Sequence, residues 1–134
     1  MKTIIAGSRG LGYRDLLFAL AACPWASEIS SVVTGGARGI DTAGAAWAGT
    51  KRIPVEIYPA KWQKGGRYNP RAGYERNRTM AALPGVAALL AVWDGASRGT
   101  SDMIQIARAQ GLRVYVHTRA DGWAPEAPPD RTGL

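Results

Sequence analysis

Three segments of this chain follow one pattern: a short apolar run, a glycine-rich turn, and then a segment with helical spacing. In the central segment a β-branched run at residues 30–34 meets the turn at residues 35–39, and a helical pattern covers residues 40–49. The turns at residues 7–10 and 94–100 have a similar composition. Strands that alternate with helices form an open parallel sheet through right-handed crossovers. The pattern therefore predicts an α/β fold, a Rossmann-like three-layer sandwich with about five parallel strands and four helices.

The expected strands are short and rich in apolar or β-branched residues, at residues 3–6, 30–34, 53–58, 85–93 and 112–116. The first helix is expected to end at Pro24 and the last to end at Gly111, with Asp102 in the first turn of the last helix. In the second helix Trp47 is expected in the core. Residues 1–117 would form one domain, and the Pro-rich residues 118–134 a loosely held C-terminal tail.

Composition narrows the classes of function. The chain has 134 residues, enough for one domain with its own core, and its net charge of +7 suits an anionic partner. The single cysteine, Cys23, excludes an internal disulfide and fits a reducing cytoplasm. One histidine, His117, leaves little material for a histidine metal site or a Ser-His-Asp triad, so we expect no metal and no cofactor. No apolar stretch reaches the ~18 residues of a membrane span, so no membrane partner is expected.

The three turns follow strands, so they would share the carboxyl edge of the sheet, where open α/β sheets bind ligands. Helix starts offer free N–H groups, and each turn carries one arginine, which together favour an oxyanion such as phosphate. The turns match neither the GxGxxG fingerprint nor a Walker A loop. The predicted phosphate-binding residues in and next to the turns are Gly7, Ser8, Arg9, Gly35, Gly36, Ala37, Arg38, Gly39, Asp41, Asp94, Ser97, Arg98, Gly99 and Thr100.

Residues 61–78 form a basic and aromatic segment. It carries six lysines and arginines against one acid, Glu75, and three aromatic residues are interleaved with them. Two glycines and a proline would prevent a long regular element, and a helix is expected from about residue 72. A long loop of this kind is either functional or a solvated, flexible run of charges. We favour a lid over an anionic ligand, formed by Trp62 and Tyr68.

Five motifs, in order along the chain, resemble the SLOG superfamily and within it the YspA-type branch. They are GSR at residues 7–9, GGARGID at 35–41, YPAKW at 58–62, AGYERNRTM at 72–80 and SRGTSDMI at 97–104. The resemblance covers residues 1 to about 117. It implies a Rossmann-like fold, a nucleotide-type ligand related to NAD or ADP-ribose, and a homodimer. Many YspA-type proteins occur in phages or in conflict systems, so the resemblance also implies a setting of that kind.

Residue by residue, Gly99 and Thr100 resemble the Gly-Thr of the phosphate loop in LOG phosphoribohydrolases. Arg76 and Asn77 resemble the Arg-Lys pair before the helix of those enzymes, which adds both to the predicted nucleotide-binding residues. Met103 stands where the LOG enzymes have a catalytic Glu. Asp102 is one residue away, but on a helix that corresponds to a rotation of about 100°. The stretch at residues 74–78 also resembles the RNR segment of the single-stranded DNA-binding protein DprA.

We therefore expect a module that binds ADP-ribose, NAD or a related adenine nucleotide, as a sensor or by sequestering it. The alternative is a hydrolase of a nucleotide N-glycosidic or phosphoester bond, with Arg76 and Asp102 as its catalytic residues and Asp41 or Asp94 as other candidate bases. A second alternative is a DprA-like binder of single-stranded DNA that uses the basic segment.

Overall fold

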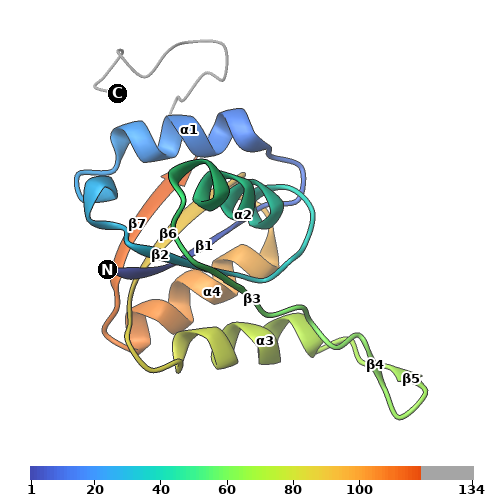
Figure 1. The fold of residues 1–134 in the computed structure, drawn as a ribbon. Helices are drawn as coiled ribbons and strands as arrows, with labels where there is room; N and C mark the ends of the chain where they lie inside the picture. The colour runs from blue at the N-terminus through green and yellow to red at the C-terminus, as the bar shows by residue number, and fades with distance from the viewer. Residues whose placement is uncertain (119–134) are drawn as a thin grey trace.

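The computed structural model describes residues 1–118 and contains a five-stranded, fully parallel sheet with the strand order β3-β2-β1-β6-β7 (Figure 1). The strands occupy the predicted segments with small shifts at their ends. The predicted tail from residue 119 onward lies outside the described residues. The bounds of the strands are Lys2–Gly7 for β1, Ser31–Thr34 for β2, Val55–Ile57 for β3, Val86–Trp93 for β6 and Arg113–Thr118 for β7.

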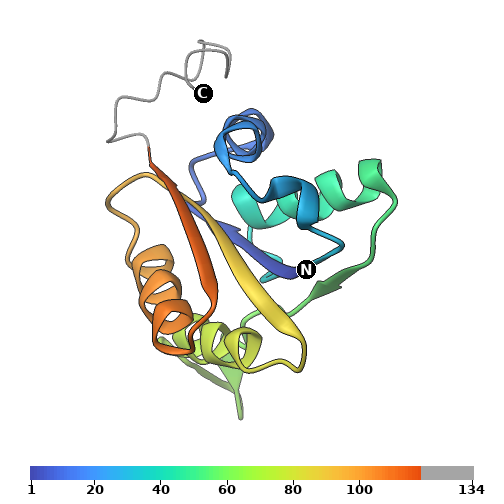
Figure 2. The same ribbon diagram turned by 90° about the vertical axis from the view of Figure 1, so that its left-hand side faces the viewer.

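Two helices cover each face of the sheet, which confirms the three-layer α/β fold (Figure 2). On one face α1 (Tyr13–Ala22) and α2 (Ile40–Lys51) pack on the sheet, and Trp47 is buried there as predicted. On the other face lie α3 (Ala72–Ala81) and α4 (Arg98–Ala109). Neighbouring residues of one strand alternate between the two cores: Leu90 faces the first and Leu89 the second. None of the helices in residues 1–118 is long and apolar enough to cross a membrane.

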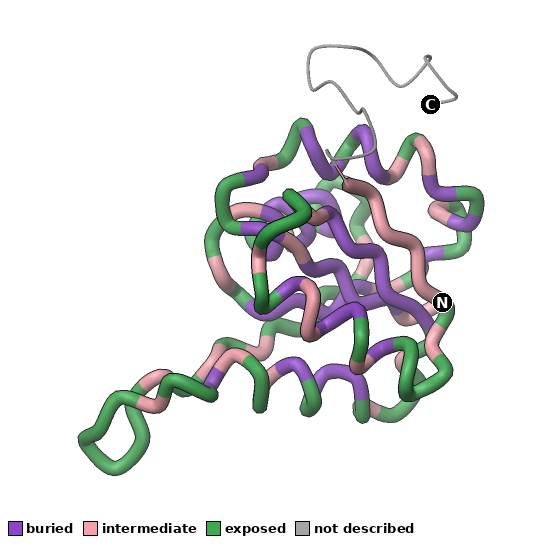
Figure 3. The backbone as a smooth tube through the Cα atoms, turned by 180° about the vertical axis from the view of Figure 1, so that it is seen from behind, coloured by how far each residue is buried: buried purple, intermediate pink, exposed green. Residues whose placement is uncertain are grey.

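The basic segment contains a small antiparallel hairpin that the sequence analysis did not predict. Strands β4 (Gln63–Lys64) and β5 (Arg67–Tyr68) pair across Gly65 and Gly66. Both glycines have positive φ, 61° and 78°, as a two-residue hairpin turn of the I′ kind requires. The hairpin tip projects from the body of the protein and is exposed (Figure 3).

The last helix begins earlier than predicted. Ser97 is its N-cap and accepts a hydrogen bond from the Thr100 amide, so α4 starts at Arg98. Asp102 is therefore the fifth residue of the helix and lies in its second turn, not in the first turn as predicted. Along α4, Ile104 is buried and faces the core, whereas the C-cap residue Gln110 is exposed.

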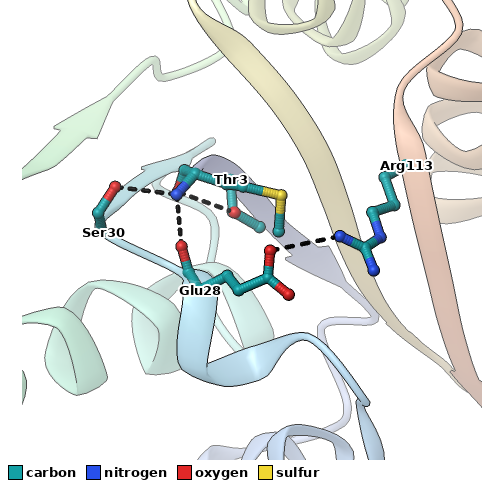
Figure 4. A network of polar contacts seen from close by, with 5 residues as sticks. Thr3, Glu28, Ser30 and Arg113 are labelled. Carbon is teal, nitrogen blue, oxygen red and sulfur yellow. Dashed lines mark hydrogen bonds and ion pairs between the residues drawn. The ribbon is translucent and has the colours of Figure 1, made fainter.

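At the amino end of the sheet a set of polar contacts joins segments that are distant in sequence (Figure 4). The terminal amine of Met1 donates to the Glu28 carbonyl and, at 3.0 Å, to Ser30 Oγ. Thr3 Oγ1 donates to the Met1 carbonyl at 3.2 Å, and Arg113 pairs with Glu28 at 3.5 Å. These contacts connect β1 and β7 to the short 3-10 helix η1 (Ala26–Glu28). They lie at the opposite end of the sheet from the carboxyl ends of the strands, where the candidate site is.

Candidate functional site

A cavity of about 450 Å³ lies at the carboxyl ends of the strands. Strands β1 and β6 are neighbours in the centre of the sheet, and the helices that follow them, α1 and α4, pack on opposite faces. This is a topological switch point, where open α/β sheets bind ligands. Twelve of the residues predicted to form the site line the cavity: Gly7, Arg9, Ala37, Asp41, Trp62, Tyr68, Arg76, Asn77, Asp94, Ser97, Gly99 and Thr100.

The other predicted residues do not line this cavity. Arg38 and Arg98 are exposed and absent from its wall, so only Arg9 of the three arginines in the glycine turns lines the cavity. The second guanidinium of the cavity belongs to Arg76, on α3. Also outside the lining are Ser8, Gly35, Gly36, Gly39 and Asp102. The wall further includes seven residues that the prediction missed: Ala6, Gly10, Pro70, Gly73, Tyr74, Met80 and Met103.

Three glycines allow the turns to pack closely around the cavity. A Cβ at Gly7 would lie 2.2 Å from the Val92 carbonyl oxygen on β6, and one at Gly39 would lie 2.6 Å from the Arg9 carbonyl oxygen. Gly39 also has a positive φ of 82°. The turns after β1 and β2 are therefore in direct contact. A Cβ at Gly35 would lie 2.1 Å from Arg76 Nη1, so Gly35 leaves room for an arginine of the protein rather than for a ligand as predicted.

Arg76 is held in place by backbone carbonyls. Its Nη1 donates to the Gly35 carbonyl at 2.7 Å and to the Tyr58 carbonyl at 3.3 Å, while its Nε donates to Asn77 Oδ1 at 3.2 Å. Burial lowers the pKa of Arg76 from its ordinary value, and the nearby Asp41 carboxylate opposes that shift. The result is a fixed, partly buried cation whose position is set by three elements of the fold.

Asn77 connects this arginine to α4. The buried Asn77 amide donates to the Gly99 carbonyl at 3.2 Å and to Asp102 Oδ2 at 3.0 Å. The predicted catalytic pair is thus bridged by Asn77, and Asp102 holds Asn77 in place from outside the cavity wall. Met103, which is buried, lines the cavity one position further along α4.

Many amides in the glycine turns bond within the protein. In the turn after β2, the Gly36 amide donates to Thr34 Oγ1 at 3.3 Å and the Ala37 amide donates to Asp41 Oδ2 at 3.2 Å. These two amides of the predicted phosphate-binding turn therefore already have acceptors within the protein: a hydroxyl at Gly36 and a carboxylate at Ala37.

Several backbone amides of the turn after β6 likewise have acceptors within the protein. Asp94 Oδ1 accepts from the Ala96 and Ser97 amides at 2.8 Å each, and the Asp94 amide donates to Ser8 Oγ at 3.0 Å. Ser8 is buried and connects β1 to β6, instead of meeting a ligand as predicted. Other amides near the cavity have no acceptor within residues 1–118, among them those of Arg9, Gly10, Arg98 and Gly99.

The base of the hairpin forms an aromatic wall. The Trp62 and Tyr68 rings are stacked, with centroids 6.0 Å apart and an interplanar angle of 9°. The Arg9 guanidinium lies over the Trp62 ring, 5.8 Å from its centroid. The predicted lid residues therefore line the cavity, and Trp62 contacts its exposed cation Arg9, while the hairpin tip points away from the body (Figure 1).

The pKa values of the two carboxyl groups that line the cavity, Asp41 and Asp94, are shifted in opposite directions. Burial raises the pKa of Asp41 above its ordinary value, although the Ala37 amide and the Arg76 and Arg9 cations oppose the shift. The amides of Ser97 and Ala96 hold the pKa of Asp94 below its ordinary value. Asp41 thus accepts a proton more readily in the folded protein than in the unfolded chain.

This raised pKa predicts how Asp41→Asn changes the pH dependence of stability. The folded protein binds the Asp41 proton more tightly, so wild type gains stability at low pH and loses it as pH rises through the raised pKa. The free energy of unfolding of wild type minus that of Asp41→Asn should fall as pH rises from the ordinary aspartate pKa to the raised pKa, and then level off. Urea unfolding of both proteins from pH 3.5 to 7 measures this difference. A difference that rises with pH would contradict the direction of the shift.

Comparison of the chain with family models, curated proteins and solved structures gave no match. The likeness to the SLOG superfamily therefore rests on the motifs alone. Across residues 1–118, no group of three or more His, Cys, Asp or Glu side chains is placed to hold a metal ion.

Proposed function

We propose that the cavity binds a phosphate-bearing, nucleotide-derived ligand, and that the protein acts as a sensor or sequestering module for it. The observation that carries this proposal is the combination of Arg9 and Arg76 with unoccupied backbone amides in one cavity at the switch point. A volume of about 450 Å³ falls within the range of small-molecule sites, roughly 300–1,000 Å³.

The phosphate would bind between the turn after β1 and the start of α4. The amides of Gly10 and Gly99 belong to residues of the cavity wall and have no acceptor among the described residues. The N-terminus of a helix carries a partial positive charge, which favours an anion there. Arg9 adds a full charge to the same cavity wall, and a guanidinium can bind two phosphate oxygens at once.

The base would stack on the aromatic wall of Trp62 and Tyr68. Stacking on an aromatic side chain contributes roughly 1–3 kcal/mol per base. A phosphate end beside an aromatic end fits an adenine nucleotide such as ADP, ADP-ribose or NAD, which is also the ligand class that the SLOG-like motifs imply.

The hydrolase alternative has less support. Met103 places an apolar side chain in the cavity where LOG enzymes have their catalytic acid, and Asp102 lies outside the wall. The two carboxylates that do line the cavity, Asp41 and Asp94, each accept hydrogen bonds from backbone amides. Binding without turnover is therefore the better supported function.

Calorimetric titration tests the proposal and separates the two arginines. We expect at least one of ADP, ADP-ribose, NAD or inorganic phosphate to bind wild type, and Arg9→Ala to weaken that binding by about 10-fold or more, because a charge-assisted hydrogen bond contributes roughly 1.5–3 kcal/mol. Arg38→Ala is the matched control: it removes an arginine outside the cavity and should change the affinity less than about 3-fold. Failure of every ligand to bind, or equal effects of the two substitutions, would contradict the proposal.

A further inference from the structure

Asp41 is the more buried of the two carboxylates that line the cavity. Its residue is 5% exposed, and it belongs to the first turn of α2. Its Oδ2 accepts from the Ala37 amide at 3.2 Å. Arg76 and Arg9 are near enough to lower its pKa, as does a backbone contact with Gly35, but no side chain of residues 1–118 forms a hydrogen bond or an ion pair with its carboxylate oxygens. A buried carboxylate in a cavity wall thus retains capacity to accept hydrogen bonds from a ligand.

The charge of Asp41 decides what kind of ligand group can approach it. A phosphate next to the turn after β2 would meet a carboxylate already bonded to the Ala37 amide, and the two negative charges would repel each other. A neutral donor, such as a hydroxyl group, would instead give the carboxylate a further hydrogen bond without a second negative charge. One part of the cavity, near Arg9, is therefore positively charged, and another part, at Asp41, accepts hydrogen bonds.

These two parts are close together. Gly39, two residues before Asp41, packs so tightly on the turn after β1 that a Cβ there would lie 2.7 Å from the Arg9 Cα. The part of a nucleotide that adjoins its phosphate is the sugar, and a ribose carries two neighbouring hydroxyl groups. The flat surface that suits the base belongs to Trp62 and Tyr68 on the hairpin, so the ribose is the neutral part left for Asp41.

We propose that Asp41 accepts hydrogen bonds from the ribose hydroxyls of the ligand and makes the cavity selective for ribonucleotides over deoxyribonucleotides. This inference rests on the proposed nucleotide-binding function. The carboxylate is a specificity-determining group, and it requires a ligand with a free ribose diol. Removal of a hydroxyl from the ligand takes one donor away from the buried carboxylate, which is costly because the group has already lost its water.

Titration of ADP, 2′-deoxy-ADP and 3′-deoxy-ADP against wild type and Asp41→Asn tests the inference. We expect at least one deoxy analogue to bind wild type about 10-fold or more weakly than ADP. In Asp41→Asn the side-chain carbonyl can still accept from the Ala37 amide, while the amino group that replaces the other oxygen cannot accept a hydroxyl proton. The difference between ADP and the deoxy analogue should then shrink to less than about 3-fold. Asp94→Asn, which neutralises the other carboxylate of the cavity, should keep the difference seen in wild type.

The outcomes separate this inference from the function on which it rests. If ADP and both deoxy analogues bind wild type equally, and Arg9→Ala still weakens them, the nucleotide site stands and the ribose selectivity is overturned. If Asp41→Asn still binds ADP more tightly than the deoxy analogue to the same degree as wild type, another residue recognises the ribose hydroxyl. That result also overturns the role of Asp41. If none of ADP, ADP-ribose, NAD or inorganic phosphate binds, both proposals fail. The comparison of analogues on wild type needs no substitution, so it holds even if Asp41→Asn does not fold.

Discussion

Gly7→Ala is expected to destabilise the protein by about 3 kcal/mol or more, the upper end of what overpacking usually costs. The new Cβ would lie 2.2 Å from the Val92 carbonyl oxygen and 2.7 Å from Ile40 Cγ1. The Val92 carbonyl accepts from the Ser8 amide at 3.0 Å in the centre of the sheet, so it cannot move without loss of β1–β6 pairing. Urea unfolding followed by far-UV circular dichroism measures the loss.

Gly10→Ala is the matched control, because it adds the same methyl group three residues later in the same turn. No atom lies within 4 Å of a Cβ at Gly10, and its φ is not in the left-handed region. Its free energy of unfolding should stay within about 0.5 kcal/mol of wild type, as for most exposed substitutions. Equal stability of the two variants would mean that β1 and β6 do not approach as closely as the structure has them.

The order of strands and helices could be predicted from the sequence because each local signal agrees with the global fold. The apolar run that became β6 is buried on the two faces of the sheet, as its composition requires. The edge strand β3 is weaker: its three residues are exposed, and a mixed run such as residues 53–58 does not define where pairing starts and stops. The hairpin had a usable signal, Gly65-Gly66, but its flanking residues lack the apolar alternation that usually identifies strands.

The start of α4 also had a signal that the prediction did not use. A serine three residues before a threonine, Ser97 and Thr100, can form an N-cap, and in the structure it does. Recognition of this cap would have moved Asp102 from the first turn of the helix to the second. The hydrogen bond from Asn77 that then holds Asp102 joins residues 25 positions apart, and no local pattern encodes it.

The position of the site was predictable, whereas its charged groups were not. Parallel strands bring their following turns to one edge, so the glycine turns had to meet there. Which arginine enters the cavity depends on side-chain packing: Arg76 reaches the Gly35 carbonyl across 41 residues because Gly35 has no Cβ in its way. The sequence also does not reveal that Asp41 and Asp94 accept the amides of their own turns. Sequence reasoning therefore overestimated the number of amides free for an anion.

Arg76→Met is expected to destabilise the protein by roughly 2–4 kcal/mol, since it removes a partly buried cation together with three hydrogen bonds. Methionine fills a similar space, so the loss is mainly polar. The Gly35 carbonyl and Asn77 Oδ1 lose their donor, and Asp41 loses the nearby charge that favours its ionised form. The loss should therefore grow as pH rises and Asp41 becomes ionised, and be larger at pH 7 than at a pH near the ordinary aspartate pKa.

Arg78→Met is the matched control for this substitution. Arg78 lies two residues further along α3, is exposed, and donates only to the Tyr74 carbonyl of its own helix, at 3.1 Å. We expect its free energy of unfolding to change by less than about 0.5 kcal/mol. Urea unfolding of both variants at pH 4 and pH 7 makes the comparison. Equal losses in the two variants, or an Arg76→Met loss that is smaller at pH 7 than at pH 4, would show that Arg76 does not stabilise the ionised Asp41. In that case the proposed electrostatic coupling between Arg76 and Asp41 would have to be abandoned.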